Sequence, residues 1–409
     1  VTGTISGLIA TENAEGIEGV EVNISGNYSQ ATVTTSAGMY SFTNLETDID
    51  VSVIPYLNAN PSNGVTTFDL VLISKHILGI RMLDSPYKMI AADVNKSESI
   101  STLDLIQIRK LVLQINTEFP NNTSWRFIPS DYSFPEANNP WLEFFPEVAS
   151  HNNIGEEVLA NFVGVKVGDV NQSVLANAHA QQDRSLDGKV DFSLTDQILL
   201  AGEEYPVIFR NDGNLPLDGW QMALSLDGVT IVDIAYNLAQ EENFNYAPTE
   251  DNLLLASWHQ TGLASMDQNG EQVFFTLILK AEEDIRLSDA LGIRESRSLN
   301  PEAYRAEEPL RLGLNFTSES ASSFSLEQNT PNPFQTSSQI KFALAQEEEI
   351  TFSVQNLQGQ IIYQFNGKYA AGEHLITLNR QLLGNAQGVL SYTLSTADVS
   401  LTKKMVLLP

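Results

Sequence analysis

The residues with the clearest chemistry lie in the segment DVNKSESISTLD, from Asp93 to Asp104. Counted from Asp93 as position 1, oxygen-bearing side chains recur at Asn95, Ser97, Ser99, Ser101 and Asp104. Calcium requires six to eight oxygen ligands within a short reach, and twelve-residue loops supply them from these positions, with a backbone carbonyl at position 7. The spacing therefore predicts a calcium site with the ligands Asp93, Asn95, Ser97, Ser99 and Asp104.

Two features of this loop bear on the prediction. Glu98 stands at position 6, where calcium loops carry Gly for a sharp turn, so its side chain costs strain while its carboxylate adds negative charge. The Asp93-Val94-Asn95 segment also fits a simpler interpretation, an Asx turn that caps the next helix without a metal. One loop alone leaves both interpretations open.

A helix is predicted directly after the loop, because apolar residues recur at helical spacing from Leu105 to Ile115. The same loop–helix pattern occurs earlier, where DLVLISKHILGI (69–80) is in register with DLIQIRKLVLQI (104–115). This repetition favours the calcium interpretation, because a helix cap alone does not require a matched loop. The first loop has weaker candidate ligands, which are Asn58, Asn60, Ser62, Gly64 and Asp69.

Asp69 is the one carboxylate among the candidates of the first loop, and a single carboxylate attracts a divalent cation poorly. Asn63 stands at position 6 and tolerates a left-handed backbone, so the loop shape survives. We therefore expect the second loop to bind calcium. The first loop is expected to bind calcium weakly or to be filled by hydrogen bonds.

Two tandem loop–helix units with no helix before either loop resemble a type I dockerin module, and this resemblance implies calcium as the cofactor. A third Asp-Val-Asn segment, from Asp169 to Asn171, resembles an extension of dockerin-like regions in proteins secreted by gliding Gram-negative bacteria. Asp169 and Asn171 are thus weaker candidate ligands that cap the module or complete the first site. An Asx turn at the end of the domain explains them equally well.

Composition argues against several classes of function. The 409 residues carry a formal charge of −29, so the chain would repel phosphate backbones, and nucleic acid is not an expected partner. There is no cysteine for a disulfide or for thiol chemistry. No apolar run approaches the ~20 residues of a membrane span. The start at VTGTISG, without Met or an apolar signal segment, indicates a processed protein or the C-terminal part of a longer one.

Alternating apolar residues predict a mainly β fold, with tandem Ig-like β-sandwich domains and one small α-helical, dockerin-like calcium module inserted between them. The predicted domains are a sandwich at 1–56, the loop–helix module with an aromatic extension at 57–175, a linker at 176–188, a second sandwich at 189–318 and a last sandwich at 319–409. The pattern from VTGTISGLI to YSFTNL resembles the carboxypeptidase regulatory-like or Cna-B-like modules that act as stalks. The strand order from EYPVIF to VFFTLILKA resembles a cohesin.

The extension after Ile115 is rich in Pro, Asn and aromatic residues, among them Trp125, Phe127 and Trp141. These residues are too apolar for a linker. We expect irregular structure whose aromatic rings pack on the two helices. Exposed aromatic rings that bind sugars are the alternative.

The last domain carries a set of residues at characteristic places, which are Pro331, Asn332, Pro333, Phe334, Gly359, Gly388, Lys403 and Lys404. With these residues it resembles the type A C-terminal sorting domain of type IX secretion. The resemblance implies a secreted protein at the cell surface, or in an extracellular appendage, of a Gram-negative bacterium. Its secretion machinery would then be one partner of the chain.

The sequence offers no Ser-His-Asp arrangement, phosphate loop or HExxH motif, and His259 is expected to be structural. We therefore expect a non-enzymatic, calcium-stabilised extracellular protein that serves as a stalk, an adhesin or a filament subunit. Its partners would be other copies of the chain or other surface proteins, through dockerin-like and cohesin-like contacts on the Lys75 and Lys110 helices. The alternative is the accessory region of a larger secreted hydrolase, in which Trp125 and Trp141 contact carbohydrate.

Overall fold

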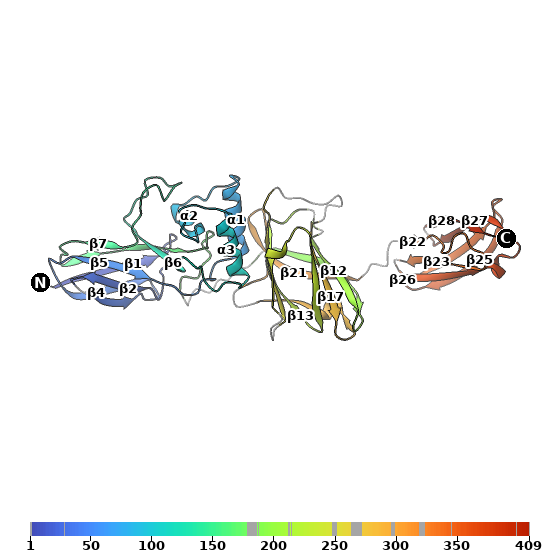
Figure 1. The fold of residues 1–409 in the computed structure, drawn as a ribbon, viewed down its shortest axis with the longest axis horizontal. Helices are drawn as coiled ribbons and strands as arrows, with labels where there is room; N and C mark the ends of the chain where they lie inside the picture. The colour runs from blue at the N-terminus through green and yellow to red at the C-terminus, as the bar shows by residue number, and fades with distance from the viewer. Residues whose placement is uncertain are drawn as a thin grey trace. The chain divides into compact units, whose positions relative to one another are not determined.

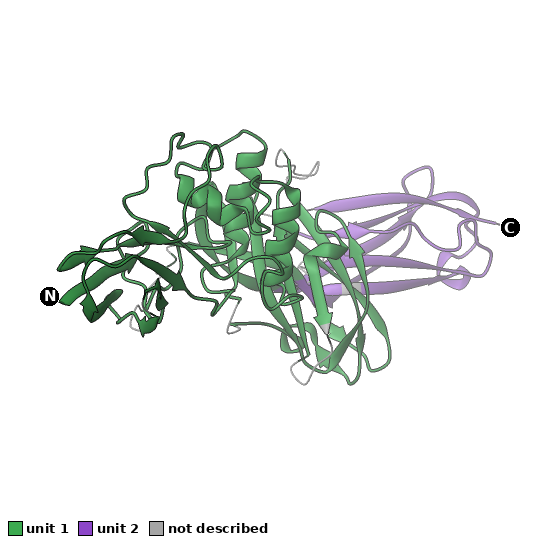
Figure 2. Cartoon of the chain, turned by 60° about the vertical axis from the view of Figure 1, so that its left-hand side comes forward, with its two compact units in different colours: residues 1–194, 198–316 green, residues 195–197, 317–409 purple. Residues whose placement is uncertain are grey.

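The computed structural model describes residues 2–27, 29–177, 186, 188–211, 213, 215–247, 252–262, 272–295, 299–318, 324–344, 346–397 and 399–408. The chain divides into two compact units (Figure 2). The first unit comprises residues 1–194 and 198–316, and the second comprises residues 195–197 and 317–409. Strands dominate both units, which confirms the predicted mainly β class.

The N-terminal sandwich of the first unit consists of two sheets. One sheet has the order β4-β1-β9-β6 with β8 beside β1, and the other has the order β3-β2-β5-β7. Alternate residues of β1 point into the core, where Ile5 and Ile9 are fully buried. The strands are β1 (Thr2–Ala10), β2 (Glu21–Gly26), β3 (Gln30–Val33), β4 (Met39–Glu46), β5 (Val51–Tyr56), β6 (Trp125–Pro129), β7 (Ala149–His151), β8 (Glu157–Leu159) and β9 (Phe162–Lys166).

Strands β6 to β9 correct the expectation that the aromatic extension is irregular and packs on the helices. β6 pairs with β9, and β8 and β9 run parallel to β1. Trp125 and Phe127 accordingly lie in the core of the N-terminal sandwich. Phe134 and Trp141 do pack against the helical core as expected, whereas Phe144 is 90% exposed. The N-terminal sheets are thus completed by a segment that follows the helices in sequence.

Three helices lie between the N-terminal strands and the second sandwich (Figure 1). They are α1 (Thr67–Ile77), α2 (Pro86–Ala92) and α3 (Thr102–Val112). Both predicted helices are present as α1 and α3, and they contact each other. Each begins with a capping box, formed by Thr66 and Asp69 in α1 and by Ser101 and Asp104 in α3. The short helix α2 was not predicted, although Ser85 before Pro86 is a typical helix start.

The second sandwich contains a sheet with the order β14-β17-β12-β10-β21-β20-β13-β16-β15, with β19 beside β13, and a short β11-β18 pair. Its core surrounds Trp220, which is fully buried among Phe192, Phe274 and Trp258. The strands are β10 (Lys189–Asp196), β11 (Ile198–Leu199), β12 (Glu204–Asn211), β13 (Gly219–Leu226), β14 (Val229–Tyr236), β15 (Phe244–Ala247), β16 (Leu253–His259), β17 (Gln272–Ala281), β18 (Ile285–Arg286), β19 (Leu291–Arg294), β20 (Glu302–Arg305) and β21 (Glu308–Ser318). Two short helices, η1 (Glu241–Asn243) and α4 (Leu287–Ala290), complete it.

The second unit is a separate small sandwich, with sheets of order β22-β23-β26 and β25-β24-β27-β28. The buried Tyr392 hydroxyl ties its opening segment to the core, because it donates to the carbonyl of Glu327 at 2.8 Å and accepts from the amide of Asn329 at 2.9 Å. The elements are β22 (Ser325–Leu326), β23 (Ser337–Leu344), β24 (Glu348–Gln355), β25 (Ile361–Tyr369), β26 (Gly372–Asn379), η2 (Arg380–Leu383), β27 (Gly388–Ser395) and β28 (Ser400–Leu407).

The predicted linker falls largely outside the described residues, which omit 178–185 and 187. Ala176, at its start, is buried in the core of the N-terminal sandwich. Among the helices that the structure describes, none is long and apolar enough to cross a membrane.

Candidate metal centre

The second loop connects α2 to α3 and has a buried carboxylate at each end. Asp93 ends α2, and its two carboxylate oxygens accept hydrogen bonds from the backbone amides of Ser97 and Glu98, both at 2.8 Å. Asp104 lies in the first turn of α3, where one oxygen accepts from the backbone amide of Ser101 at 2.9 Å. Both side chains are fully buried. The loop therefore positions two carboxylates with neutral donors around them.

Burial raises the pKa of Asp104, and the nearby charge of Asp93 raises it further, against the hydrogen bonds from Ser101. A cation bound between the two carboxylates would offset this repulsion, because it favours the ionised form of both.

Asn95 provides the observation that tests whether the loop fits calcium. Its side-chain oxygen is buried and has no hydrogen-bond partner among the described residues. An unpaired buried oxygen costs about 1–3 kcal/mol, and a hard cation is the partner that such an oxygen fits. Ser97 and Ser99 lie side by side on the exposed side of the loop, with their hydroxyl oxygens 3.0 Å apart. The residues present therefore fit a calcium ion.

Glu98 adopts the backbone conformation that position 6 requires. Its φ is +60°, in the left-handed region that favours Gly, and Lys96 is also left-handed at +57°. The sharp turn of a calcium loop is thus present without its Gly. Within the described parts of the chain no group of three or more His, Cys, Asp or Glu side chains could hold a metal ion. A cation at this loop would consequently depend on neutral oxygens as well as on the two carboxylates.

The first loop differs because the protein itself provides hydrogen-bond partners for the side chains of Asn58 and Asn63. The side-chain oxygen of Asn58 accepts from the backbone amide and the hydroxyl of Ser124, at 2.9 and 2.8 Å. The Asn63 side chain exchanges two hydrogen bonds with the backbone of Leu175, at 3.0 and 3.3 Å. The left-handed residues are Asn60 and Gly64, not Asn63 as expected from its position. Ser62 lines a cleft of about 720 Å³ beside this loop.

The third Asp-Val-Asn segment lies against the first loop. Asp69 is fully buried, and one of its oxygens accepts from the backbone amides of Val170 and Asn171, at 2.8 and 3.2 Å. Asp169 accepts from the amides of Ser173 and Val174, at 3.0 and 2.8 Å. The segment therefore both contacts the first loop and forms its own turn. Burial raises the pKa of Asp69 well above its usual value, and the charge of Asp169 adds to the effect.

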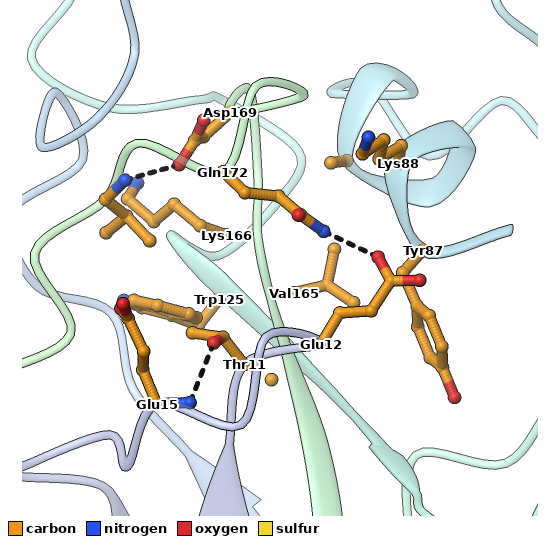
Figure 3. Close-up of a pocket in the computed structure, with 13 residues that line it drawn as sticks. Thr11, Glu12, Glu15, Tyr87, Lys88, Trp125, Val165, Lys166, Asp169 and Gln172 are labelled. Carbon is orange, nitrogen blue, oxygen red and sulfur yellow. Dashed lines mark hydrogen bonds between the residues drawn. The ribbon is translucent and has the colours of Figure 1, made fainter. Parts of the chain in front are cut away.

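Lys166 completes this region and was missed by the sequence reasoning. It ends β9, is 4% exposed, and donates from Nζ to the carbonyl of Pro61 at 2.7 Å. Burial lowers the pKa of Lys166 to about 8, while the nearby carboxylates of Asp169 and Asp69 oppose the shift. Figure 3 shows Lys166 beside Asp169 at a cavity of about 30 Å³. The available signal was a lysine at the end of an otherwise apolar strand, three residues before Asp169.

Both loop-following helices pack onto the second sandwich of the same chain. The hydroxyl of Thr67 lies 2.6 Å from that of Ser257, and the amide of Thr67 donates to Gln221 at 2.7 Å. The rings of Phe68 and Tyr304 stack with centroids 5.0 Å apart. These contacts form the helix–sandwich interface, and Ala223, Leu255 and Leu299 of the sandwich belong to the same apolar core as the helices.

Charged residues surround this interface. Lys75 lies 3.2 Å from a carboxylate oxygen of Asp218 and 3.2 Å from one of Glu307, which also pairs with Arg81. Lys75 was expected to face a second molecule, but it is engaged within the chain, whereas Lys110 is exposed. Arg109 of α3 contacts His259, whose expected structural role agrees with its burial.

The residues of the sorting motif lie in the second unit. Asn332 accepts from the amide of Val406 at 2.9 Å, and the amide of Phe334 donates to the carbonyl of Val406 at 3.0 Å. Pro331 and Pro333, each preceded by a cis peptide bond, therefore stand beside β28, which carries Lys403 and Lys404. Gly359 has a φ of +77° in the turn between β24 and β25, and Gly388 begins β27.

No protein-family model matches the chain, and no curated protein matches it in sequence. Solved structures that resemble it include the seventh ScaB type I cohesin of Pseudobacteroides cellulosolvens, at 14% identity over 31% of this chain and 87% of that one, with a TM-score of 0.22. The type II cohesin dyad of the ScaA adaptor of Acetivibrio cellulolyticus matches at 9% identity over 52% and 89%, with a TM-score of 0.22. The major pilin subunit BcpA of Bacillus cereus matches at 7% identity over 99% and 95%, with a TM-score of 0.20. At these TM-scores none of the matches carries the functional argument.

Proposed function

We propose that the chain is a non-enzymatic, calcium-stabilised extracellular protein that serves as a stalk, an adhesin or a subunit of an appendage. The observation that carries the proposal is the position of Asp104. It supplies a candidate ligand of the second loop and lies in the first turn of α3, the helix whose Arg109 contacts His259 of the second sandwich. Calcium at the second loop would fix the start of this helix and so brace the helix–sandwich interface.

The second loop is also connected to the N-terminal sandwich. The Asn122 side chain, just before β6, donates to the carbonyl of Asp93 at 3.5 Å, and the amide of Gly168, just after β9, donates to the carbonyl of Ala91 at 2.8 Å. Calcium would thus stabilise the junction on both sides. Binding to the folded state alone adds stability as RT ln(1 + [Ca]/Kd). A rigid junction between sandwiches suits a stalk, which must hold its length.

Export by type IX secretion remains part of this proposal and rests on the sorting motif of the second unit. The chain would then interact with the secretion machinery of a Gram-negative bacterium and act at its surface or in the medium. Other copies of the chain or other surface proteins are the proposed binding partners. Because Lys75 and Thr67 face the sandwich of their own chain, a partner that uses this helix face must first open the helix–sandwich interface.

The alternative is an accessory region of a larger secreted hydrolase. Trp125 is buried in the N-terminal core and is closed to carbohydrate. The exposed Phe144 and the partly buried Trp141 are aromatic candidates that are more open than Trp125. Binding to insoluble polysaccharide, lost on Phe144→Ala, would favour this alternative.

The test of the leading proposal is Asp93→Ala combined with Asp104→Ala. We expect the variant to lose calcium binding in calorimetry, and its Tm in millimolar calcium to fall to the value measured in excess chelator or below. Asp131→Ala with Glu136→Ala is the matched control, because it removes two exposed carboxylates outside the loops. Unchanged calcium binding and unchanged Tm in the loop variant would refute the proposal.

Light scattering in calcium and then in chelator addresses assembly. A large particle present only in calcium would support an appendage subunit. A monomer in both conditions would leave calcium as an internal brace and favour a stalk.

A further inference from the structure

We propose that the ammonium group of Lys166 is a built-in cation of the first loop, so that the first loop binds no calcium while the chain remains folded around the lysine. The first loop would thereby have lost its dependence on a metal. Only the expected total of one calcium ion per chain rests on the proposed function of the second loop.

The geometry places the lysine directly on the first loop. Pro61 is position 4 of that loop, and its carbonyl accepts the hydrogen bond from Nζ of Lys166 at 2.7 Å. The lysine is 4% exposed. A buried ammonium is costly unless carboxylates or hydrogen-bond acceptors compensate for the water it loses. Groups around the lysine must therefore compensate for the burial of its ammonium charge.

Two buried carboxylates supply that reason. Asp69 holds position 12 of the first loop, and Asp169 begins the adjoining Asp-Val-Asn segment. Each raises the pKa of Lys166 through its charge, which means that each stabilises the ammonium form. The charge of Asp169 disfavours the ionised form of Asp69 and raises its pKa. Lys166 thus offsets the same kind of carboxylate repulsion that exists at the second loop.

Two asparagine side chains of the first loop are occupied in a way that agrees with this assignment. Asn58 and Asn63 hydrogen-bond to Ser124 and Leu175. In the second loop, by contrast, the Asn95 side-chain oxygen has no partner in the described structure. The hydrogen bonds to Asp93 and Asp104 come from the neutral donors of Asn95, Ser97, Glu98 and Ser101. The first loop thus holds a protein cation, whereas the carboxylates of the second loop accept from neutral donors of the described chain.

The experiment counts calcium ions per chain in calorimetry and measures Tm in chelator and in calcium. Lys166→Met removes the charge at similar volume, and Lys166→Gln puts a neutral oxygen in its place. Each change is made in the natural chain and in the Asp93→Ala, Asp104→Ala background. We call the latter the silent background, because its second loop has lost both carboxylates. Lys110→Met, an exposed lysine of α3, is the control.

In the natural chain we expect one calcium ion, and in the silent background we expect none. Loss of Lys166 should add one ion in both, and should lower Tm in chelator by an amount that calcium partly restores. A variant that folds only in calcium would give the same support. Two ions in the natural chain would overturn the proposal. So would Lys166 variants that gain no ion, or whose Tm loss calcium leaves unchanged, because Lys166 would then be an ordinary buried donor.

If the natural chain binds no calcium and the Lys166→Met variant binds one ion, this inference stands. The proposed calcium site of the second loop is then rejected. The two proposals therefore fail in distinguishable ways.

Discussion

Nη2 of Arg109, on α3, lies 3.2 Å from Nδ1 of His259, on β16 of the second sandwich. Arg109 can only donate, so Nδ1 must accept, and the imidazole is neutral with its proton on Nε2. Burial lowers the pKa of His259 to about 3, and the positive charge of Arg109 contributes to the shift. The helix–sandwich interface therefore contains a histidine that is neutral when the chain is folded.

This neutral histidine predicts that acid weakens the first unit. The unfolded histidine binds its proton near pH 6.5, whereas the folded one does so near pH 3. Between these pH values the unfolded state binds more protons than the folded state does. The free energy of unfolding therefore rises with pH and decreases as pH falls from about 6.5 towards 3. We expect a loss on the order of a few kcal/mol, measured by urea unfolding across this range.

His259→Asn is the matched variant, because its amide oxygen can accept from Arg109 but does not titrate. The natural chain should lose more stability than this variant on acidification. Parallel curves for the two proteins would show that His259 does not control the acid response.

The buried hydroxyl groups of Thr67 and Ser257 should be more costly to remove singly than together. Removal of one hydroxyl, by Thr67→Val or Ser257→Ala, leaves the other without its partner and should cost about 1–3 kcal/mol. Removal of both should cost clearly less than the sum. Urea unfolding of the four proteins gives the coupling free energy directly. Additive costs would mean that the 2.6 Å contact contributes nothing of its own.

Lys75 and Lys110 occupy matched positions in the two helices but should respond differently to charge reversal. Lys75→Glu places a carboxylate against Asp218 and Glu307, and should destabilise the helix–sandwich interface by at least ~1 kcal/mol. Hydrogen exchange at the amides of α1 and β16 should accelerate. Lys110→Glu, on the exposed face, should leave exchange unchanged. Equal effects from both substitutions would contradict the packing of α1 on the sandwich.

Glu98→Gly should relieve the backbone strain of the second loop. A left-handed residue with a Cβ costs about 1–2 kcal/mol in strain. Gly avoids this strain but loses more backbone entropy on folding, so we expect a net stabilisation of up to ~1 kcal/mol. Glu98→Ala keeps the Cβ while it removes the charge. If both variants weaken calcium binding equally, the Glu98 carboxylate attracts the ion. If Glu98→Gly stabilises the chain and Glu98→Ala leaves its stability unchanged, the gain comes from relief of backbone strain.

The local features of this chain could be predicted from its sequence. The starts of α1 and α3 follow from Asp69 and Asp104, because an Asp three residues after Thr or Ser both ends a loop and completes a capping box. The left-handed turn at Glu98 follows from its loop position. These features depend on residues within one turn of each other, so the sequence pattern is sufficient.

Long-range pairings could not be predicted in the same way. Whether β9 joins β1 depends on contacts such as the one between the amide of Leu8 and the side chain of Asn161, which are separated by 153 residues. Lys166 was missed for the same reason, because its partners Pro61 and Asp69 come from another part of the chain. Alternation shows that a segment is a strand, but it does not identify the neighbouring strand.

The parallel pairing of β1 with β9 has a mechanical consequence. A pull between Thr2 and Asn177 would draw β1 and β9 along their lengths in opposite directions, because the first is held at its start and the second at its end. Such a pull loads the hydrogen bonds between them in shear, so that they must break together. Residues 57–124 lie between β5 and β6 and are therefore outside this path of force. The candidate calcium loops would carry tension only after the β1–β9 pair has slipped.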